Sequence, residues 1–375
     1  MARNPRAIVS VTNDLFTDNR VNKVCLFLKD QGYDVLLVGR LLPDSQPLDR
    51  PYTTRRMRLL FRKGAQFYAE YNLRLFFFLL FRKADVLVSN DLDTLLANYC
   101  ASKLKRSCKL VYDSHEYYTE VPELMDRPKV KAVWESIEGW IFPKLKSVYT
   151  VNGSIASRYQ AKYGVELKVV RNMAPKYQPE KVLSKKELGL PEDQFIMILQ
   201  GAGINVHRGA EELIEAMKLL ENVLLLIIGD GDVIPQIKKN VKEYDLLNSV
   251  WILGKKPYAE MMQFTAQADL GFTLDKANNL NYRFSLPNKV FDYIHAGTPI
   301  ICTDLPEVRK VVEGHEVGVI LKELTPESIA EAVNKLKNDP ERLAQLKNNC
   351  QLAAEKESWE GECEVLKTIY PKIGN

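Results

Sequence analysis

A segment near position 290 places polar side chains at helical spacing directly after a loop. Ser285 and Gly297 are suited to begin and end a helix between them. One face of that helix carries three polar residues, Asn288, Asp292 and His295. Free N–H groups at the helix start, with Lys289 beside them, attract phosphate, and Asp292 one turn later can accept hydrogen bonds from a ribose diol. The segment predicts a nucleotide site; the alternative is the solvated polar face of an ordinary helix.

A second candidate is the glycine-rich loop between a strand near 195–199 and a helix that follows position 209. The loop contains Gly203, Asn205 and Arg208, and an arginine at a helix start can bind phosphate in a bidentate manner. A surface arginine is the alternative reading. Neither this loop nor Gly229-Asp230-Gly231 completes a dinucleotide fingerprint, and the chain has no Gly-Lys-Ser/Thr P-loop, so dehydrogenases and P-loop NTPases are disfavoured.

Another candidate site follows the strand predicted over residues 109–112. His115 can donate a hydrogen bond or carry charge near neutral pH, and Asp113 or Glu116 can orient its ring or act as a base. A buried histidine with satisfied hydrogen bonds is the alternative.

Metal ligands are not expected. Asp91 and Asp93 form an Asp-x-Asp pair, but they follow a strand and open a helix, so N-capping explains them. The six cysteines include no Cys-x-x-Cys pair, and the four histidines show no His-x-x-x-His spacing.

Short apolar strands alternate with helical patterns along the whole chain, as in parallel sheets covered on both faces. The first half predicts strands over 7–11, 34–38, 85–89, 109–112 and 147–151. The second half predicts strands over 195–199, 223–228, 250–253, 268–273, 299–302 and 317–321. The polar stretch 171–191 is the expected linker. Two doubly wound α/β domains are therefore expected, with a ligand cleft between them.

The charge is concentrated in one stretch. The chain carries a net charge of +4, yet residues 50–83 hold nine Lys and Arg and one acid, Glu70, interleaved with aromatic and aliphatic residues. We expect one or two cationic amphipathic helices that suit an anionic membrane face or a phosphorylated acceptor; a core helix with a basic outer face is the alternative. Nucleic acid is not expected as a partner. No apolar run is long enough to span a bilayer and no secretory signal is evident, so we expect a cytoplasmic protein.

The motif Leu286-Pro-Asn-Lys-x-Phe-Asp-Tyr-x-x-x-Gly-x-Pro-Ile resembles the nucleotide-sugar motif of GT-B glycosyltransferases, particularly glycosyltransferase family 4. The 200–217 loop and the 112–120 segment also resemble motifs of that family, and the last helix resembles its C-terminal helix. The resemblance implies an acceptor-side domain over 1–171 with 358–375, a donor domain over 172–357, and a last helix that crosses back to the first domain.

The resemblance also implies functional roles. Donor binding is expected at one set of residues: Gly203, Asn205, Arg208, Gly231, Lys255, Ser285, Asn288, Lys289 and Asp292. His115 approaches the transferring sugar, with Asp113 and Glu116 as further active-centre groups; Asn19 and Arg20 face the acceptor or the diphosphate. The family's second acid corresponds to Phe284, and one of its loop cations to Ala202.

We therefore expect transfer of a hexosyl or related sugar from a nucleoside diphosphate sugar to an acceptor hydroxyl, with retention and without a metal or other cofactor. The acceptor is expected to be a lipid-linked or cell-surface glycan precursor, reached at the inner membrane face. Two alternatives stay open: a sugar-nucleotide epimerase or hydrolase of the same fold, and a non-catalytic nucleotide-sugar-binding or membrane-associated scaffold subunit.

Overall fold

The computed structural model describes residues 3–16, 18–105 and 107–370, and the chain divides into two compact units. Met173–Gly361 forms the second unit, and the described residues on either side of it form the first. The outermost limits predicted for the first domain, residues 1–2 and 371–375, lie outside the described residues, as does Thr17.

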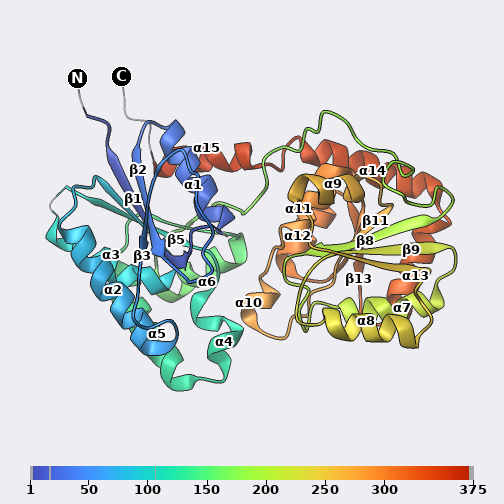
Figure 1. The fold of residues 1–375 in the computed structure, drawn as a ribbon, viewed down its shortest axis with the longest axis horizontal. Helices are drawn as coiled ribbons and strands as arrows, with labels where there is room; N and C mark the ends of the chain where they lie inside the picture. The colour runs from blue at the N-terminus through green and yellow to red at the C-terminus, as the bar shows by residue number, and fades with distance from the viewer. Residues whose placement is uncertain (1–2, 17, 106, 371–375) are drawn as a thin grey trace. The chain divides into compact units, whose positions relative to one another are not determined.

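The first unit is built on a parallel sheet with the strand order β3-β2-β1-β4-β5-β6-β7 (Figure 1). Its strands are β1 (Arg6–Asp14), β2 (Asp34–Arg40), β3 (Thr53–Met57), β4 (Val86–Asn90), β5 (Lys109–Ser114), β6 (Val148–Thr150) and β7 (Lys168–Val169). Its helices are α1 (Asn19–Asp30), α2 (Gly64–Leu80), α3 (Leu92–Leu104), η1 (Tyr118–Glu120), α4 (Pro122–Met125), α5 (Pro128–Ile141), η2 (Phe142–Lys144) and α6 (Gly153–Tyr163).

The basic stretch 50–83 differs from the prediction. Thr53–Met57 is the edge strand β3, paired in parallel with β2, and only Met57 in it is buried. The helix α2 then packs Phe67, Tyr71, Leu75 and Leu79 into the core, a spacing of one helical turn. One helix of the one or two expected is therefore present, and residues 53–57 form an edge strand instead of helix. No helix among the described residues is long and apolar enough to cross a membrane.

The second unit holds a parallel sheet with the order β10-β9-β8-β11-β12-β13. Its strands are β8 (Phe195–Gly201), β9 (Val223–Gly229), β10 (Val250–Gly254), β11 (Leu270–Thr273), β12 (Ile300–Thr303) and β13 (Gly318–Leu321). Its helices are α7 (Ala210–Ala216), η3 (Met217–Leu219), α8 (Ile234–Glu243), α9 (Tyr258–Ala266), α10 (Leu280–Arg283), α11 (Lys289–Ala296), α12 (Pro306–Gly314), α13 (Pro326–Lys337) and α14 (Pro340–Ala354).

Alternating side chains of the central strands serve two separate cores. Along β8, Met197 and Leu199 pack in a core with α7, α8 and α13, whereas Ile196 and Ile198 pack in a core with α9, α11, α12 and α14. This is the two-residue period of a strand covered on both faces. The structure confirms the predicted fold class of two doubly wound parallel sheets.

The last helix, α15 (Trp359–Ile369), begins in the second unit and continues into the first. Within the first unit, Glu362 accepts a hydrogen bond from Arg171 Nε at 2.9 Å, and the carbonyl of Ile369 accepts one from Lys109 Nζ at 2.7 Å. The predicted return of the C-terminal helix to the first domain is therefore present.

Both strand orders reverse direction once, and these reversals locate the ligand sites. In the first unit the chain moves outward from β1 and then resumes at β4 on its other side; in the second unit β8 and β11 have the same relation. Open α/β sheets bind ligands at the carboxyl ends of the strands that flank such a point.

Candidate functional site

Two glycine-rich loops meet at the carboxyl ends of β8 and β9 in the second unit. Gly229 has φ +141°, and a Cβ atom there would lie 1.8 Å from the carbonyl oxygen of Gly201. A Cβ on Gly231 would lie 2.0 Å from the carbonyl oxygen of Ile204. The loops therefore touch through their backbones, and Ile204 N–H donates to the carbonyl of Asp230 at 2.9 Å. Glycine is required at both positions for this contact.

Two cations lie beside these loops at the switch point. Arg208 donates from Nη1 to Asp275 at 2.6 Å, and its guanidinium lies 4.6 Å from the ring centre of Tyr282. Lys289, at the first turn of α11, places Nζ 3.7 Å from where a Cβ on Gly201 would stand. Burial lowers the pKa of Lys289, and Arg208 lowers it further, against the opposing effects of Asp275 and Asp292. An anionic ligand would stabilise both charges.

Asp275 was not predicted. It is fully buried after β11, and its Oδ1 has no hydrogen-bond partner among the described residues, while Oδ2 holds Arg208. Its position two residues beyond a predicted strand end was the only signal in the sequence. The pair holds Arg208 in place before any ligand binds.

The predicted ribose ligand Asp292 is buried on α11, with 7% of its surface exposed. Its carboxylate accepts a hydrogen bond from the Tyr258 hydroxyl at 3.0 Å and one from Gln200 Nε2 at 3.3 Å. The carboxylate is thus fixed in orientation by neighbours on α9 and β8. A diol at this position would have to share or displace the Tyr258 hydroxyl.

The start of α11 differs from the prediction. The helix begins at Lys289, with Asn288 at the N-cap position and no side-chain cap, so Ser285 does not cap it. The short helix α10 precedes it, and Ser285 Oγ is buried without a hydrogen-bond partner in the described part of the chain. Gly297 ends α11 in the left-handed conformation at φ +72°, as predicted.

The remaining donor-site candidates lie around the same loops. Asn205 Oδ1 accepts from the N–H of Asp232 at 3.1 Å, so it braces the 229–232 loop, and Gly203 lies beside that side chain. Lys255 pairs with Asp230 at 3.0 Å, and both side chains are more than half exposed. A cavity of about 380 Å³ lies at the ends of β9 and β10; its lining includes Gly229, Asp230, Gly254 and Lys255.

In the first unit, the predicted His115 is surrounded by carboxylates. Its Nδ1 lies 3.2 Å from Asp91 Oδ2, and its Nε2 lies 3.3 Å from Asp113 Oδ2 and 3.2 Å from Asn90 Oδ1. Burial acts to lower the pKa of His115, but Asp91 and Asp113 together raise it to about 9. His115 is therefore a cation at neutral pH and is unsuited to act as a general base.

Arg20, predicted to face the acceptor or the diphosphate, is buried in an ion pair with Asp113. It is 5% exposed and donates to Asp113 at 2.7 Å and to the carbonyl of Val170 at 3.1 Å. Burial would raise the pKa of Asp113, but Arg20 and His115 hold it at about 2, which rules out Asp113 as a base at neutral pH. Asn19 is the first residue of α1, which Asp18 caps by accepting from Val21 N–H.

Asp91 has a larger role than the predicted helix cap. It occupies the N-cap position of α3, yet its side chain makes no cap; Oδ1 instead accepts the N–H of His115 at 2.8 Å. Its φ of +55° is rare for a residue other than glycine, and such strain is common at functional sites. Burial raises the pKa of Asp91 to about 7, although His115 acts to lower it.

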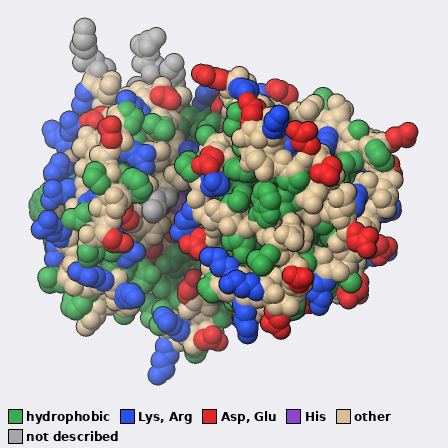
Figure 2. Space-filling view, turned by 45° about the vertical axis from the view of Figure 1, so that its right-hand side comes forward, with side chains coloured by type: hydrophobic (Ala, Val, Ile, Leu, Met, Phe, Trp, Pro, Cys, Tyr) green, Lys and Arg blue, Asp and Glu red, His purple; other side chains and the backbone are tan. Residues whose placement is uncertain are grey.

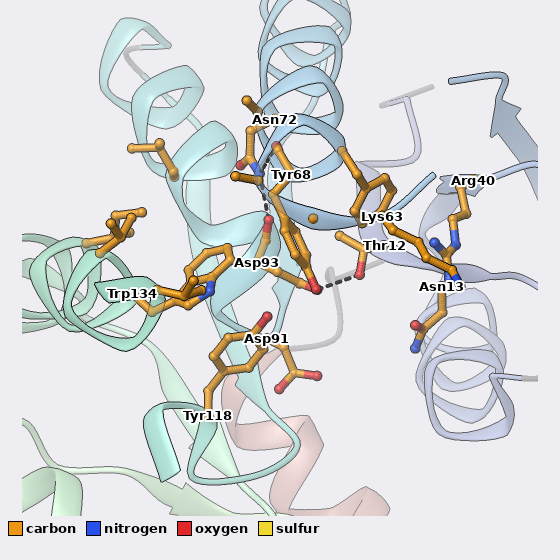
Figure 3. Close-up of a pocket in the computed structure, with 18 of the residues that line it drawn as sticks. Thr12, Asn13, Arg40, Lys63, Tyr68, Asn72, Asp91, Asp93, Tyr118 and Trp134 are labelled. Carbon is orange, nitrogen blue, oxygen red and sulfur yellow. Dashed lines mark hydrogen bonds between the residues drawn. The ribbon is translucent and has the colours of Figure 1, made fainter. Parts of the chain in front are cut away.

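A cavity of about 1650 Å³ opens at the switch point of the first unit (Figure 3). Asp91, Asp93 and Glu116 line it together with Thr12 and Asn13 at the end of β1. Thr12 donates to Asp93 Oδ2 at 2.5 Å, and burial raises the pKa of Asp93 to about 7. Of the three active-centre residues predicted here, Glu116 lines the cavity.

Within the described ranges, no three His, Cys, Asp or Glu side chains gather as a metal site would require.

Two family models match consecutive parts of the chain. The model described as Glycosyltransferase Family 4 matches residues 19–173, and the model described as Glycosyl transferases group 1 matches residues 181–352. Among curated proteins, a chitobiosyldiphosphodolichol beta-mannosyltransferase of Candida albicans is 22% identical over 270 residues, which are 64% of this chain and 57% of that protein. The chain spans between 36% and 57% of the lengths of the three curated relatives that match it.

Solved structures share the fold across nearly the whole chain. A sucrose-phosphate synthase from Thermosynechococcus elongatus has a TM-score of 0.78 at 17% identity and covers 98% of both chains. HepE from Anabaena, in complex with UDP, has a TM-score of 0.73 at 15% identity and covers 98% of this chain and 100% of its own.

The two parallel-sheet units and these neighbours define a protein of the GT-B fold. Within that class, the chain resembles the glycosyltransferases of family 4 over both units, as its motifs predicted.

Proposed function

We propose that the protein transfers a sugar from a nucleoside diphosphate sugar to an acceptor hydroxyl. The observation that carries this proposal is the cluster of Arg208 and Lys289 against the backbone of the glycine loops at the switch point of the second unit. A diphosphate leaving group develops negative charge, and fixed cations beside it stabilise that charge. The structural neighbour HepE is solved in complex with UDP, which supports a nucleotide as ligand.

In this proposal each group of the second unit has one task. Asp292 accepts hydrogen bonds from the ribose, Arg208 and Lys289 neutralise the diphosphate, and the cavity near Gly229 and Lys255 receives the base. The two cations and the start of α11 do the work that a metal ion does in other transferases, so no metal is required. The transferred sugar is a hexosyl or related group.

The first unit supplies the acceptor side. His115, held as a cation by Asp91 and Asp113, donates a hydrogen bond to the transferring sugar or its phosphate. Asp113 takes no part as a base, because Arg20 keeps it ionised. In this proposal the leaving phosphate itself assists removal of the acceptor proton, and the configuration of the sugar is retained.

The acceptor proposed is a lipid-linked or cell-surface glycan precursor, met at an anionic membrane surface on the cytoplasmic side. The name of the Candida albicans relative contains a sugar linked to a dolichol diphosphate. Figure 2 shows Lys and Arg side chains interspersed with apolar ones on the first unit. Several large apolar side chains of α2 and its flanking loops are exposed: Leu60 (80%), Leu73 (60%), Phe77 (48%) and Phe81 (81%). Apolar groups between cations are typical of a surface that binds anionic lipid.

Titration of UDP, GDP and ADP into the protein in EDTA tests the donor site. One of the three is expected to bind without metal, and Asp292→Ala is expected to weaken it about tenfold or more, because a carboxylate that accepts from a ribose diol is lost. Asp304→Ala is the control, since Asp304 lies on the surface beside Arg309. Equal binding by the Asp292 variant would show the ribose assignment to be wrong, and no binding at all would favour a scaffold without a donor site.

Vesicle flotation tests the membrane surface. Reversing two cations at the end of α2 with Arg82→Glu and Lys83→Glu is expected to weaken binding to phosphatidylglycerol vesicles by at least tenfold, since each cation contributes about 1 kcal/mol. Lys239→Glu with Lys242→Glu reverses the same charge on exposed positions of α8 and is expected to change little. Equal affinity for neutral phosphatidylcholine vesicles would exclude this surface.

A further inference from the structure

The cavity of the first unit is larger and more apolar than a sugar requires. At about 1650 Å³ it exceeds the range of about 300–1,000 Å³ common for small-molecule sites. Two helices supply most of its apolar lining: Phe67, Leu73 and Phe76 come from α2, and Val130, Val133, Trp134 and Ile137 come from α5. Trp134 packs against two tyrosines that also line the cavity: the centre of its ring lies 5.1 Å from that of Tyr68 and 5.4 Å from that of Tyr118.

One end of the cavity is polar. In Figure 3, Arg40, Lys63 and Asn13 lie on one side and Trp134 on the opposite side, with Tyr68 and Tyr118 between them. The Arg40 guanidinium lies 5.0 Å from the ring centre of Phe67, and its buried Nε has no hydrogen-bond partner among the residues that the structure describes. No acid in the described ranges forms an ion pair with Arg40, Arg62 or Lys63, and all three line the cavity. These cations suit a phosphate, while Asp91 and Asp93 at the strand ends suit sugar hydroxyls.

The apolar part reaches the protein surface. Leu73 on α2 and Val133 on α5 both line the cavity, yet 60% and 58% of their surfaces are exposed. Beyond them along the same helices stand Phe77 and Trp140, which are about half exposed and lie outside the lining. The opening is therefore bordered by the exposed apolar and cationic side chains that we assign to the membrane surface.

We propose that this cavity binds the acceptor through its hydrocarbon chain, and that the acceptor is a lipid in which a phosphate joins a sugar to a single long chain. The chain lies between α2 and α5 against Trp134, and the phosphate lies at Arg40, Arg62 and Lys63. The sugar hydroxyl is thereby held near Thr12 and Asp91 at the switch point. This inference rests on the proposed transfer and names the substrate class of its acceptor side.

Titration with alkyl phosphates of 8, 10, 12 and 14 carbons, each below its micelle concentration, tests the proposal. Binding is expected to tighten roughly fourfold for each added methylene that enters the cavity. Inorganic phosphate and the corresponding alcohols are expected to bind far more weakly, since each lacks one half of the ligand. A change in the fluorescence emission of Trp134, measured in a protein whose other three tryptophans are replaced by Phe, reports occupation of this cavity.

Two matched pairs of variants separate the cavity from the surface around it. Leu73→Glu and Val133→Glu are expected to weaken dodecyl phosphate at least tenfold, because they place a charge in the lining. Phe77→Glu and Trp140→Glu change exposed apolar side chains of the same helices outside the lining and are expected to leave this affinity nearly unchanged. Because all four positions are about half exposed or more, folding is expected to persist.

The outcomes distinguish this inference from the proposed function. Equal losses in both pairs, or affinity independent of chain length, would overturn the cavity assignment. If the nucleotide that binds the wild type binds all four variants equally, the donor site is intact and such a failure concerns the cavity alone. Absence of nucleotide binding in the wild type would instead defeat the proposed function, whatever the alkyl phosphates do.

Discussion

Replacing Arg208 with Ala is expected to lower the rate of sugar transfer by about 10²- to 10³-fold, the usual cost of removing one group that stabilises developing charge. Arg208 is fixed by Asp275 at 2.6 Å and borders the glycine loops, so its charge is in place before the leaving diphosphate forms. Such preorganisation is what makes a cation effective in the transition state. Arg208→Lys keeps the charge but loses the planar fork, and an intermediate rate is expected.

The measurement pairs transfer rates with titrations of the nucleoside diphosphate and of its nucleoside. The Ala variant is expected to lose affinity for the diphosphate and to keep its affinity for the nucleoside, because only the former meets Arg208. A merely structural role would weaken both ligands alike, since Asp275 would be left buried without its partner. Arg309→Ala, on the exposed face of α12, is the control for loss of an arginine.

The fold could be predicted because its central strands are nearly continuous apolar runs. In β9, every residue from Val223 to Ile228 is buried, and the sequence shows this as an unbroken aliphatic stretch. The strand β3 lacks that signal, because an edge strand with one covered face needs only Met57 to be apolar. Its arginines at 55 and 56 therefore favoured the wrong interpretation as part of a basic helix.

The functional site was predictable only where the residues that form it lie close together in the sequence. The end of α11 at Gly297 follows from local helix signals, whereas its start at Lys289 lies four residues beyond the predicted N-cap Ser285. Arg208 was visible as a cation at a loop, but its partner Asp275 is distant in sequence and becomes its neighbour only through the order of strands β8 and β11. Pairings across a sheet are set by tertiary structure, which local patterns do not encode.

The same reason explains Arg20 and the cavity. Arg20, at the start of α1, was predicted to contact a ligand. The carboxyl end of β5 instead places Asp113 beside it, and both side chains are buried. The cavity depends on Tyr68 from α2, Trp134 from α5 and Asp91 from the end of β4, which share no local motif. What the sequence did contain was an acid directly after a strand, a position at which open α/β sheets commonly place functional groups.

Replacing Asp91 with Asn is expected to make sugar transfer sensitive to alkaline pH. Asp91 is the carboxylate that most raises the pKa of His115, against the effect of burial, to about 9. The other charges facing His115 are Asp113, which shares its charge with Arg20, and the more distant Asp93. Without Asp91 the pKa of His115 falls, so the cation present at pH 7 is lost as the pH rises toward 9.

Relative to pH 6.5, the Asn variant is expected to lose about tenfold more activity at pH 8.5 than the wild type loses over the same range. Titration of the His115 imidazole by NMR is expected to show its pKa lowered in the variant. His315→Gln is the matched control, because His315 also pairs with a carboxylate, that of Glu357, but in the second unit. An unchanged pH profile in the Asn variant would mean that protonated His115 has no part in transfer; Asp91 would then be a residue that positions the His115 loop through the N–H it accepts.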